Sequence, residues 1–191
     1  MNLRQAFRFG LWNAWLLMIW QIILPILIST FLNKNNISSR LFVSAPLRHG
    51  KLLDLTSMFL TVLSVLYSFF LPLNMNTIWF FLGLLLFVLS VSIMFSTAFA
   101  LRYSEIDQPF TTGMYRYSRH PFYFSMGLLY IGITFMTLSW IFLIFTILFF
   151  VQINIAALNE EHYCRKLYGN EYQEYMDRTP KWIGFPKPNI Q

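Results

Sequence analysis

Hydrophobic and polar positions divide the chain into three long apolar stretches separated by polar segments. The stretches cover residues 9–33, 55–101 and 121–159, and none of them contains Asp, Glu, Lys, Arg or His. A helix needs about 20 apolar residues to cross the roughly 30 Å hydrocarbon core of a bilayer. The first stretch is therefore long enough for one membrane span, and each of the other two is long enough for a pair of spans.

Turn residues mark where the two longer stretches reverse. Residues 72–76 read Pro-Leu-Asn-Met-Asn, which favours a turn, and the third stretch turns near residues 137–140. The pattern predicts an all-α integral membrane protein that forms a single domain over residues 1–191. The predicted transmembrane helices are 11–32, 55–73, 77–100, 121–137 and 139–158, followed by a C-terminal segment at 159–191.

Composition supports a membrane protein and argues against an ordinary soluble domain. Of the 191 residues, 57% are hydrophobic and only 12% are charged, about half of the roughly 25% that is usual in soluble domains. The net charge of +6 is explained by membrane topology, so it does not predict a nucleic-acid partner.

The distribution of charge predicts the orientation. With five spans, only Arg4 and Arg8 lie on the N-terminal side of the membrane, and the other 12 Lys and Arg residues lie opposite. All eight Asp and Glu residues and the three histidines share that second side. The positive-inside rule makes it cytoplasmic and places the N-terminus outside. No charge falls within a span, which disfavours an ion-coupled transporter.

Two charged pairs stand at the ends of the last predicted hairpin. Arg119 and His120 open the fourth helix, and Glu160 and Glu161 close the fifth. If these helices form a tight antiparallel hairpin, the cation pair and the carboxylate pair emerge at the same membrane surface within side-chain reach. Basic residues at a span end often act only as interface anchors, and a glutamate there can simply pair with them. The density of polar and aromatic residues around Arg119 favours a functional site.

Several other kinds of site lack their usual signals. The histidines, His49, His120 and His162, fall in separate segments without a His-x-x-x-His pattern, so no metal site is predicted. A single cysteine, Cys164, excludes an intramolecular disulfide. The sequence has neither a Gly-x-Ser-x-Gly nor a Gly-x-Gly-x-x-Gly motif, the local signals of a hydrolase and of a Rossmann nucleotide site.

Two blocks in the C-terminal half carry a resemblance to a known family. Residues 113–123 read G-x-Y-x-x-x-R-H-P-x-Y, and after a helical hairpin Glu160 and Glu161 are followed by L-Y-G-x-x-Y-x-x-Y at 167–175. In this order and spacing the blocks resemble the isoprenylcysteine carboxyl methyltransferase family, and the chain is similar to its small prokaryotic and archaeal-type members. The resemblance covers about 110–185.

The resemblance implies an activity and a set of site residues. The activity is transfer of a methyl group from S-adenosylmethionine to the C-terminal α-carboxylate of a prenylated cysteine at the membrane and cytoplasm boundary. The products are a methyl ester and S-adenosylhomocysteine. The implied catalytic residues are Arg119, His120 and Glu160. The implied cofactor-binding residues are Thr112, Gly113, Tyr115, His120, Tyr123, Glu160 and Glu161. Ala156 stands where eukaryotic members carry an arginine, which leaves the natural substrate open.

The chemistry of such a transfer suits these residue types. A carboxylate is already ionised at pH 7, so an acceptor carboxylate needs no general base, only in-line positioning at about 3 to 3.5 Å. We hypothesise that Arg119 orients the acceptor through a bidentate contact, whereas Glu160 and Glu161 accept hydrogen bonds from the cationic cofactor. The segment 160–176 is predicted to be an interfacial helix over the site, weakened at Gly169.

Three alternatives stay open at the sequence level. The first is a methyltransferase that acts on a phospholipid or another lipid amine, which needs a base because an amine must lose a proton before it attacks. The second is a relative of the NADPH-dependent sterol-type reductases. The third is a non-catalytic membrane scaffold, which would not bind S-adenosylmethionine.

Overall fold

The computed structural model describes residues 10, 12–32, 50–102 and 108–187, and this part of the chain is helical without any strand. An isolated bridge between Asn13 and Pro72 is its one extended pairing. The helices are α1 (Trp15–Met18), α2 (Trp20–Leu32), α4 (Gly50–Ser68), α5 (Ile78–Arg102), the short 3₁₀ helix η2 (Gly113–Arg116), α6 (Pro121–Thr137), α7 (Trp140–Tyr168) and α8 (Asn170–Arg178).

Two of these helices are long and apolar enough to cross a membrane, namely α5 over Ile78–Leu101 and α7. Both expose large hydrophobic side chains along their length, such as Phe81 and Leu85 on α5 and Ile147 on α7. A continuous apolar exterior of this kind is unfavourable in water and suits a lipid environment. The structure therefore agrees with an all-α membrane protein, whereas the crossing of all five predicted spans stays a prediction.

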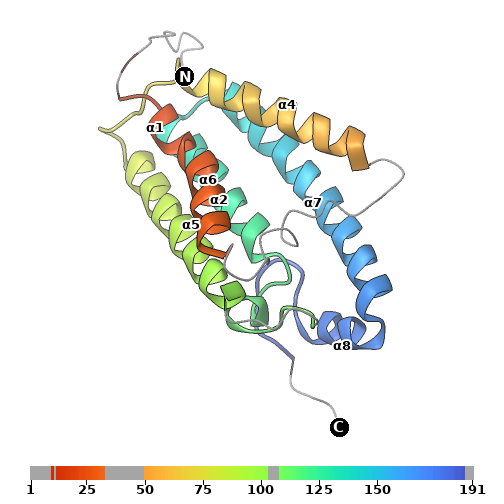
Figure 1. Cartoon of the computed structure of the whole chain (residues 1–191). Helices are drawn as coiled ribbons and strands as arrows, with labels where there is room; N and C mark the ends of the chain where they lie inside the picture. The colour runs from red at the N-terminus through yellow and green to blue at the C-terminus, as the bar shows by residue number, and fades with distance from the viewer. Residues whose placement is uncertain (1–9, 11, 33–49, 103–107, 188–191) are drawn as a thin grey trace.

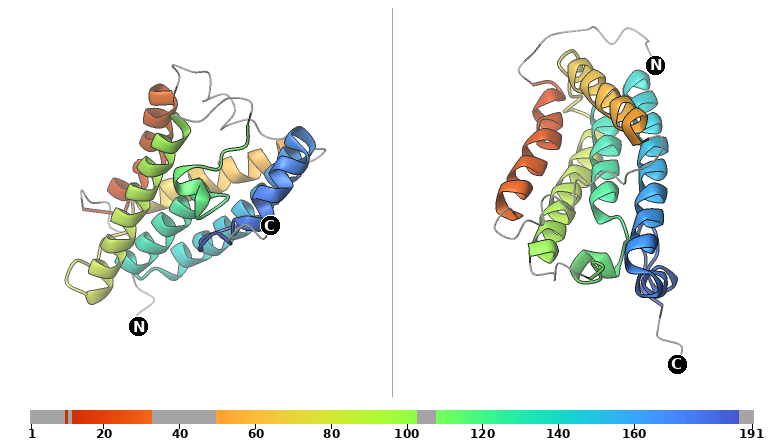
Figure 2. Two further views of the ribbon diagram at one scale, coloured as in Figure 1. Left: turned by 90° about the horizontal axis from the view of Figure 1, so that it is seen from below. Right: turned by 45° about the vertical axis from the view of Figure 1, so that its right-hand side comes forward.

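The long helices are arranged so that the two ends of the molecule differ. The chain reverses direction between α5, α6 and α7, and α4 packs across α7 (Figure 1, Figure 2). Helix α8 and the C-terminus lie at one end, which we call the α8 end. At the opposite end Trp12, Trp79 and Trp140 are exposed, as is typical of side chains at a membrane interface.

The turn between α6 and α7 lies where the sequence predicts it. Leu138 takes a left-handed conformation with φ of 53°, and the Ser139 hydroxyl accepts a hydrogen bond from the Phe142 amide at 3.2 Å. Asn74 ties the turn before α5 to the end of α6, because its side-chain amide donates a hydrogen bond to the Thr137 carbonyl at 2.8 Å. The two helices therefore form a tight antiparallel hairpin, which brings the first turn of α6 to the same end as the last turns of α7.

One predicted boundary is wrong in a way that matters for the site. The sequence predicts that the fifth transmembrane helix ends at residue 158 and that a separate interfacial helix covers 160–176, but α7 continues without a break to Tyr168. Gly169, with φ of 59°, then separates α7 from α8. The weak point predicted at Gly169 is confirmed. The change from apolar to charged residues near residue 159 does not end the helix, because both kinds of residue are compatible with helical structure.

A glycine contact allows α5 and α6 to approach closely. A Cβ atom added at Gly83 would lie 2.4 Å from the Gly132 carbonyl oxygen and 2.7 Å from Cγ of Met136. Further along the same interface the Ser90 hydroxyl donates to the Ser125 carbonyl at 2.7 Å. Small residues that permit backbone contact are typical of helix interfaces in membranes.

We predict that Gly83→Ala destabilises the protein by about 1 to 3 kcal/mol, because the added methyl group displaces α6 from its backbone contact. Unfolding in detergent micelles, followed by circular dichroism, measures the effect. Ser96→Ala is the matched control, since Ser96 is exposed on the same helix, and it should change stability by less than about 0.5 kcal/mol. An equal response of the two variants would contradict the close approach.

Candidate active site

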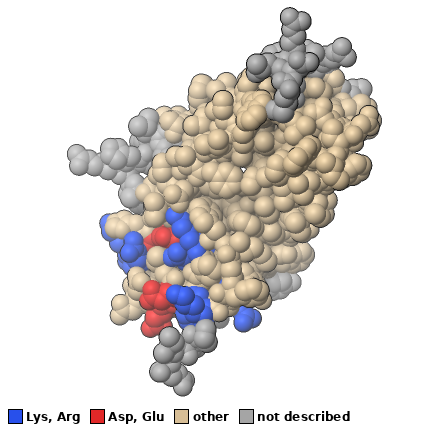
Figure 3. Space-filling model, turned by 180° about the vertical axis from the view of Figure 1, so that it is seen from behind, with Lys and Arg blue, Asp and Glu red and all other residues tan. Residues whose placement is uncertain are grey.

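Charged side chains gather at the α8 end of the molecule. Figure 3 shows acidic and basic groups close together there, whereas the rest of the visible surface carries almost none. The sequence predicts that the loops 33–54 and 101–120 lie on the same side of the membrane, and of these loops residues 33–49 and 103–107 fall outside the described residues. The charged side chains seen in Figure 3 thus gather at one end, whereas the side of the membrane on which this end lies stays a prediction.

Arg119, His120, Glu160 and Glu161 form one cluster, as the hairpin geometry predicts. The Oε1 atom of Glu161 lies 3.2 Å from Nη1 of Arg119 and 3.1 Å from Nε2 of His120. The other ring nitrogen of His120, Nδ1, lies 3.4 Å from Oε2 of Glu160. His120 therefore bridges the two glutamates, and one oxygen of Glu161 serves two cations.

The geometry favours the protonated form of His120. Each of its two ring nitrogens faces a carboxylate oxygen, and only the imidazolium form carries a proton on both. Burial by itself lowers the pKa of His120, but hydrogen bonds to Glu160 and Glu161 and the charges of these carboxylates outweigh it, so that the net pKa is raised. The four-residue cluster then carries two positive and two negative charges and is neutral as a unit.

The start of α6 determines how His120 is oriented. Pro121 occupies the first helical position, which suits its fixed φ and its missing N–H, and a proline keeps the residue before it out of the helical region. His120 accordingly has φ of −130° and ψ of 59°, and its amide donates to the Ser118 hydroxyl at 3.1 Å. Its side chain is thus presented at the helix end rather than along the helix.

The two glutamates differ in their exposure. Glu161 lies on the inner face of α7 with 6% of its side chain exposed, whereas the side chain of Glu160 is 50% exposed. Arg119 is also largely buried, and its Nε atom has no hydrogen-bond partner. A buried donor without a partner is costly, so Nε of Arg119 is an available position for an anionic oxygen.

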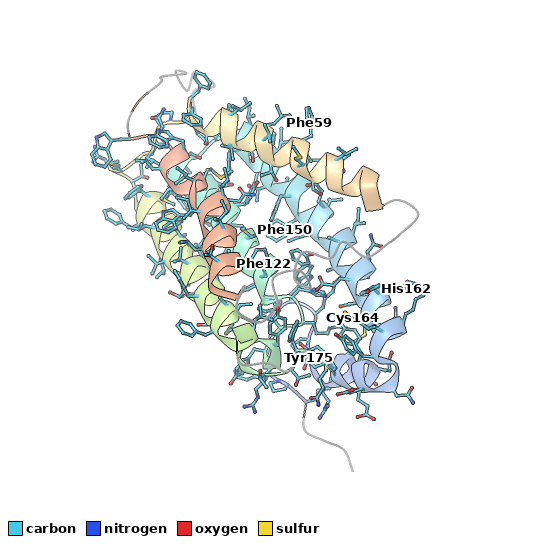
Figure 4. All side chains as sticks on the ribbon, in the orientation of Figure 1. Phe59, Phe122, Phe150, His162, Cys164 and Tyr175 are labelled. Atoms are coloured by element: carbon cyan, nitrogen blue, oxygen red, sulfur yellow. The ribbon has the colours of Figure 1, made fainter. Side chains whose placement is uncertain are left out.

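Aromatic side chains enclose the cluster. Tyr123 on α6 stacks on the His120 ring at 5.7 Å, and Trp182 approaches the same ring at 6.1 Å. Tyr175 is buried at the α8 end (Figure 4) and donates its hydroxyl hydrogen bond to the Tyr115 carbonyl at 2.7 Å. This bond fastens α8 to η2, so the tail helix is an integral part of the structure.

Burial also affects the pKa values of two tyrosine side chains near the cluster, Tyr115 and Tyr175. It raises the pKa of Tyr115 well above its usual value, and the charge of Glu160 raises that pKa further. The pKa of Tyr175 is likewise raised, first by burial. Both phenols are therefore neutral at physiological pH and act as hydrogen-bonding and packing groups rather than as bases.

Two residues expected at the site, Thr112 and Gly113, lie at the start of η2. Thr112 is exposed at the start of η2, and Gly113 has φ of 59°, a conformation that favours glycine. A Cβ at Gly113 would lie 2.6 Å from Cβ of Ala100, so its small size is required by packing against α5. His162 is exposed (Figure 4), and no group of three potential metal ligands occurs among the described residues.

Sequence reasoning did not single out two residues that border the cluster. Trp182 packs on His120, and Lys181 places its Nζ 5.3 Å from the Trp182 ring centroid while it donates to Oδ1 of Asn154 on α7 at 2.7 Å. Residues 179–183 fall within the resemblance, which covers about 110–185, but outside its two blocks. No local pattern in the sequence shows that this segment folds back onto residues 117–120.

The fold and the cluster together describe a helical protein with long apolar helices and a charged cluster at one end. A family model agrees with this class: residues 77–171, about half of the chain, match the model described as phospholipid methyltransferase. The matched region includes all four residues of the cluster, and the match indicates a membrane methyltransferase. No curated protein matches the chain.

We predict that the two glutamates contribute very differently to stability. Glu161→Gln leaves the buried Arg119 and His120 without their shared counter-ion and should cost about 3 kcal/mol. Glu160→Gln, at a half-exposed side chain, should cost less than about 1 kcal/mol. Thermal unfolding in detergent at pH 7 measures both, and a smaller loss for Glu161→Gln than for Glu160→Gln would show that the buried ion pairs are not as described.

The raised pKa of His120 also predicts how stability depends on pH. A group whose pKa is higher in the folded state stabilises that state fully below the unfolded value of 6.5, and the contribution is lost as pH rises through the folded pKa. The Tm difference between the natural protein and His120→Gln should therefore be largest near pH 6 and should shrink toward pH 9. A difference that grows with pH would show that His120 is neutral.

Proposed function

We propose that the protein transfers a methyl group from S-adenosylmethionine to the α-carboxylate of a prenylated cysteine, at the boundary between membrane and cytoplasm. The observation that carries the proposal is the cluster of Arg119, His120, Glu160 and Glu161, in which every carboxylate is already paired with a cation. Such a site binds and orients charged partners but offers no free base. The proposed orientation has the N-terminus outside and the α8 end in the cytoplasm.

The residues present fit the proposed cofactor. S-adenosylmethionine supplies an electrophilic methyl group on a sulfonium, together with an amino-acid end that carries one carboxylate and one ammonium. The half-exposed carboxylate of Glu160 suits the ammonium or the ribose hydroxyls of the cofactor, and the unpaired Nε of Arg119 remains available for the acceptor carboxylate. The aromatic faces of Tyr123 and Trp182 suit a cation or an adenine ring.

The protonation state of the cluster bears on which acceptor group the site can methylate. An amine acceptor has to give its proton to a base, whereas a carboxylate attacks as it is. Both ring nitrogens of His120 face carboxylate oxygens, which favours its protonated form, and Glu161 contacts two cationic side chains, so neither residue is suited to accept a further proton. A neighbouring guanidinium also favours an anionic acceptor. These features support a carboxylate as the group that is methylated.

A second candidate, methylation of a phospholipid amine, is favoured by the description of the matching family model. In this case Glu160 is the group best placed to take the amine proton, because its side chain is half exposed and contacts one cation only. Both candidates use the same cofactor and the same membrane location, and they differ in the acceptor group.

We predict base-labile methyl transfer to a prenylated acceptor. Labelled S-adenosylmethionine is incubated with the detergent-solubilised protein and N-acetyl farnesylcysteine, and the product is treated with alkali. Release of labelled methanol identifies an ester. A parallel reaction with phosphatidylethanolamine vesicles tests the second candidate, since a methylated amine is stable to alkali. Label in the amine arm alone would replace the first candidate by the second, and label in neither arm would refute both.

Variants connect the activity to the cluster. Arg119→Ala should reduce transfer by about 100-fold or more, because it removes the group proposed to orient a carboxylate. Glu160→Gln should leave the protein folded and reduce transfer through weaker cofactor binding. Ser96→Ala, remote from the site, is the control. Full turnover in both Arg119→Ala and Glu160→Gln would contradict the assignment of the site.

A further inference from the structure

The segment 179–187 follows α8 and lies beyond the part of the chain that matches the family model. It is held against the residues that precede α6 by main-chain hydrogen bonds. The Arg119 amide donates to the Pro180 carbonyl at 3.0 Å, and the Gly184 amide donates to the Tyr117 carbonyl at 3.0 Å. The segment is therefore built into the structure next to the cluster.

The same segment is also fixed to α7. Lys181 donates through Nζ to Oδ1 of Asn154, which lies about two turns before Glu161 on that helix. Residues 179–187 thus connect the element that carries the cations with the element that carries the carboxylates. Any shift of the segment would change the alignment of the two sides of the cluster.

Trp182 is the residue through which this segment reaches the cluster. Its ring lies 6.1 Å from the His120 ring at an interplanar angle of 55°. The His120 ring also stacks with Tyr123. With these rings in place His120 is only 3% exposed. An aromatic face stabilises a cation, and exclusion of water strengthens the neighbouring ion pairs.

We infer that residues 180–184 complete the site and that Trp182 is a positioning residue, which holds His120 in register with Glu160 and Glu161. Trp182 acts through His120 and needs no contact with the reacting atoms. The inference rests on the proposed function for its activity readout, whereas its effect on His120 is measured without any substrate.

The test compares Trp182→Phe with Trp182→Leu, because both replacements are apolar and only phenylalanine keeps an aromatic face. The direct readout is the titration of His120 by NMR in detergent, which is practicable because the chain has three histidines. The groups that contact His120 are Glu160 and Glu161 on α7 and Tyr123 on α6, and the charges of Arg119 and Lys181 act on Glu161. All of them are unchanged in both variants.

We expect the titration midpoint of His120 in Trp182→Phe to stay close to that of the natural protein. In Trp182→Leu it should fall by about half a pH unit, as the loss of one aromatic face implies. The pH at which methyl transfer declines should fall in parallel. Phe185→Ala is the control on the same segment, since Phe185 is 90% exposed, and it should change neither quantity.

Two results would overturn the inference: equal midpoints in Trp182→Phe and Trp182→Leu, or a shift of the same size in Phe185→Ala. Thermal unfolding shows whether each variant is folded, and Trp182→Met replaces the leucine variant in the same comparison if that one does not fold. If the midpoints shift as expected and no acceptor is methylated, the proposed function fails and the positioning role of Trp182 stands.

Discussion

The structure depends on one carboxylate oxygen, Oε1 of Glu161, which contacts both Arg119 and His120 at the end of the last helical hairpin. Buried charges are costly unless they are paired and hydrogen-bonded, so this contact requires α6 and α7 to meet in a fixed register. Other features serve that register. The tight turn at Leu138 fixes the register of α6 against α7 at the far end. The unbroken helix α7 maintains this register along the apolar region.

Around this ion pair the chain places elements that are distant in sequence. Tyr175 on α8 bonds to the carbonyl of Tyr115, and the segment after α8 bonds to the residues just before His120. Helix α5 supplies the support behind η2, where Gly113 packs on Ala100. The charged cluster is therefore surrounded by packed aromatic and main-chain groups on its inner side, and Glu160 is its half-exposed member.

The sequence predicts the apolar helices from their uncharged runs. It also predicts that Arg119 and His120 lie opposite the two glutamates, because two spans of similar length in a hairpin bring these residues to the same end. It misplaces the end of α7, since charged residues mark a membrane boundary and not a helix end. It does not predict the contact of Trp182 with His120. Ser118 and Lys181, next to these residues, bond across 63 positions, and no local periodicity reports such a pairing.

The choice between the two acceptor classes comes down to the proton on His120. As long as its two ring nitrogens donate to Glu160 and Glu161, the cluster is neutral and holds no base, which suits an acceptor that is already an anion. For an amine acceptor Glu160 would have to give up its contact with His120, and the longer distance of 3.4 Å makes that contact the easier one to lose. Glu161, shared by two buried cations, has no such freedom. The half-exposed Glu160 is thus the residue on which the two proposed acceptors make different demands, and its buried neighbour Glu161 holds the cluster together.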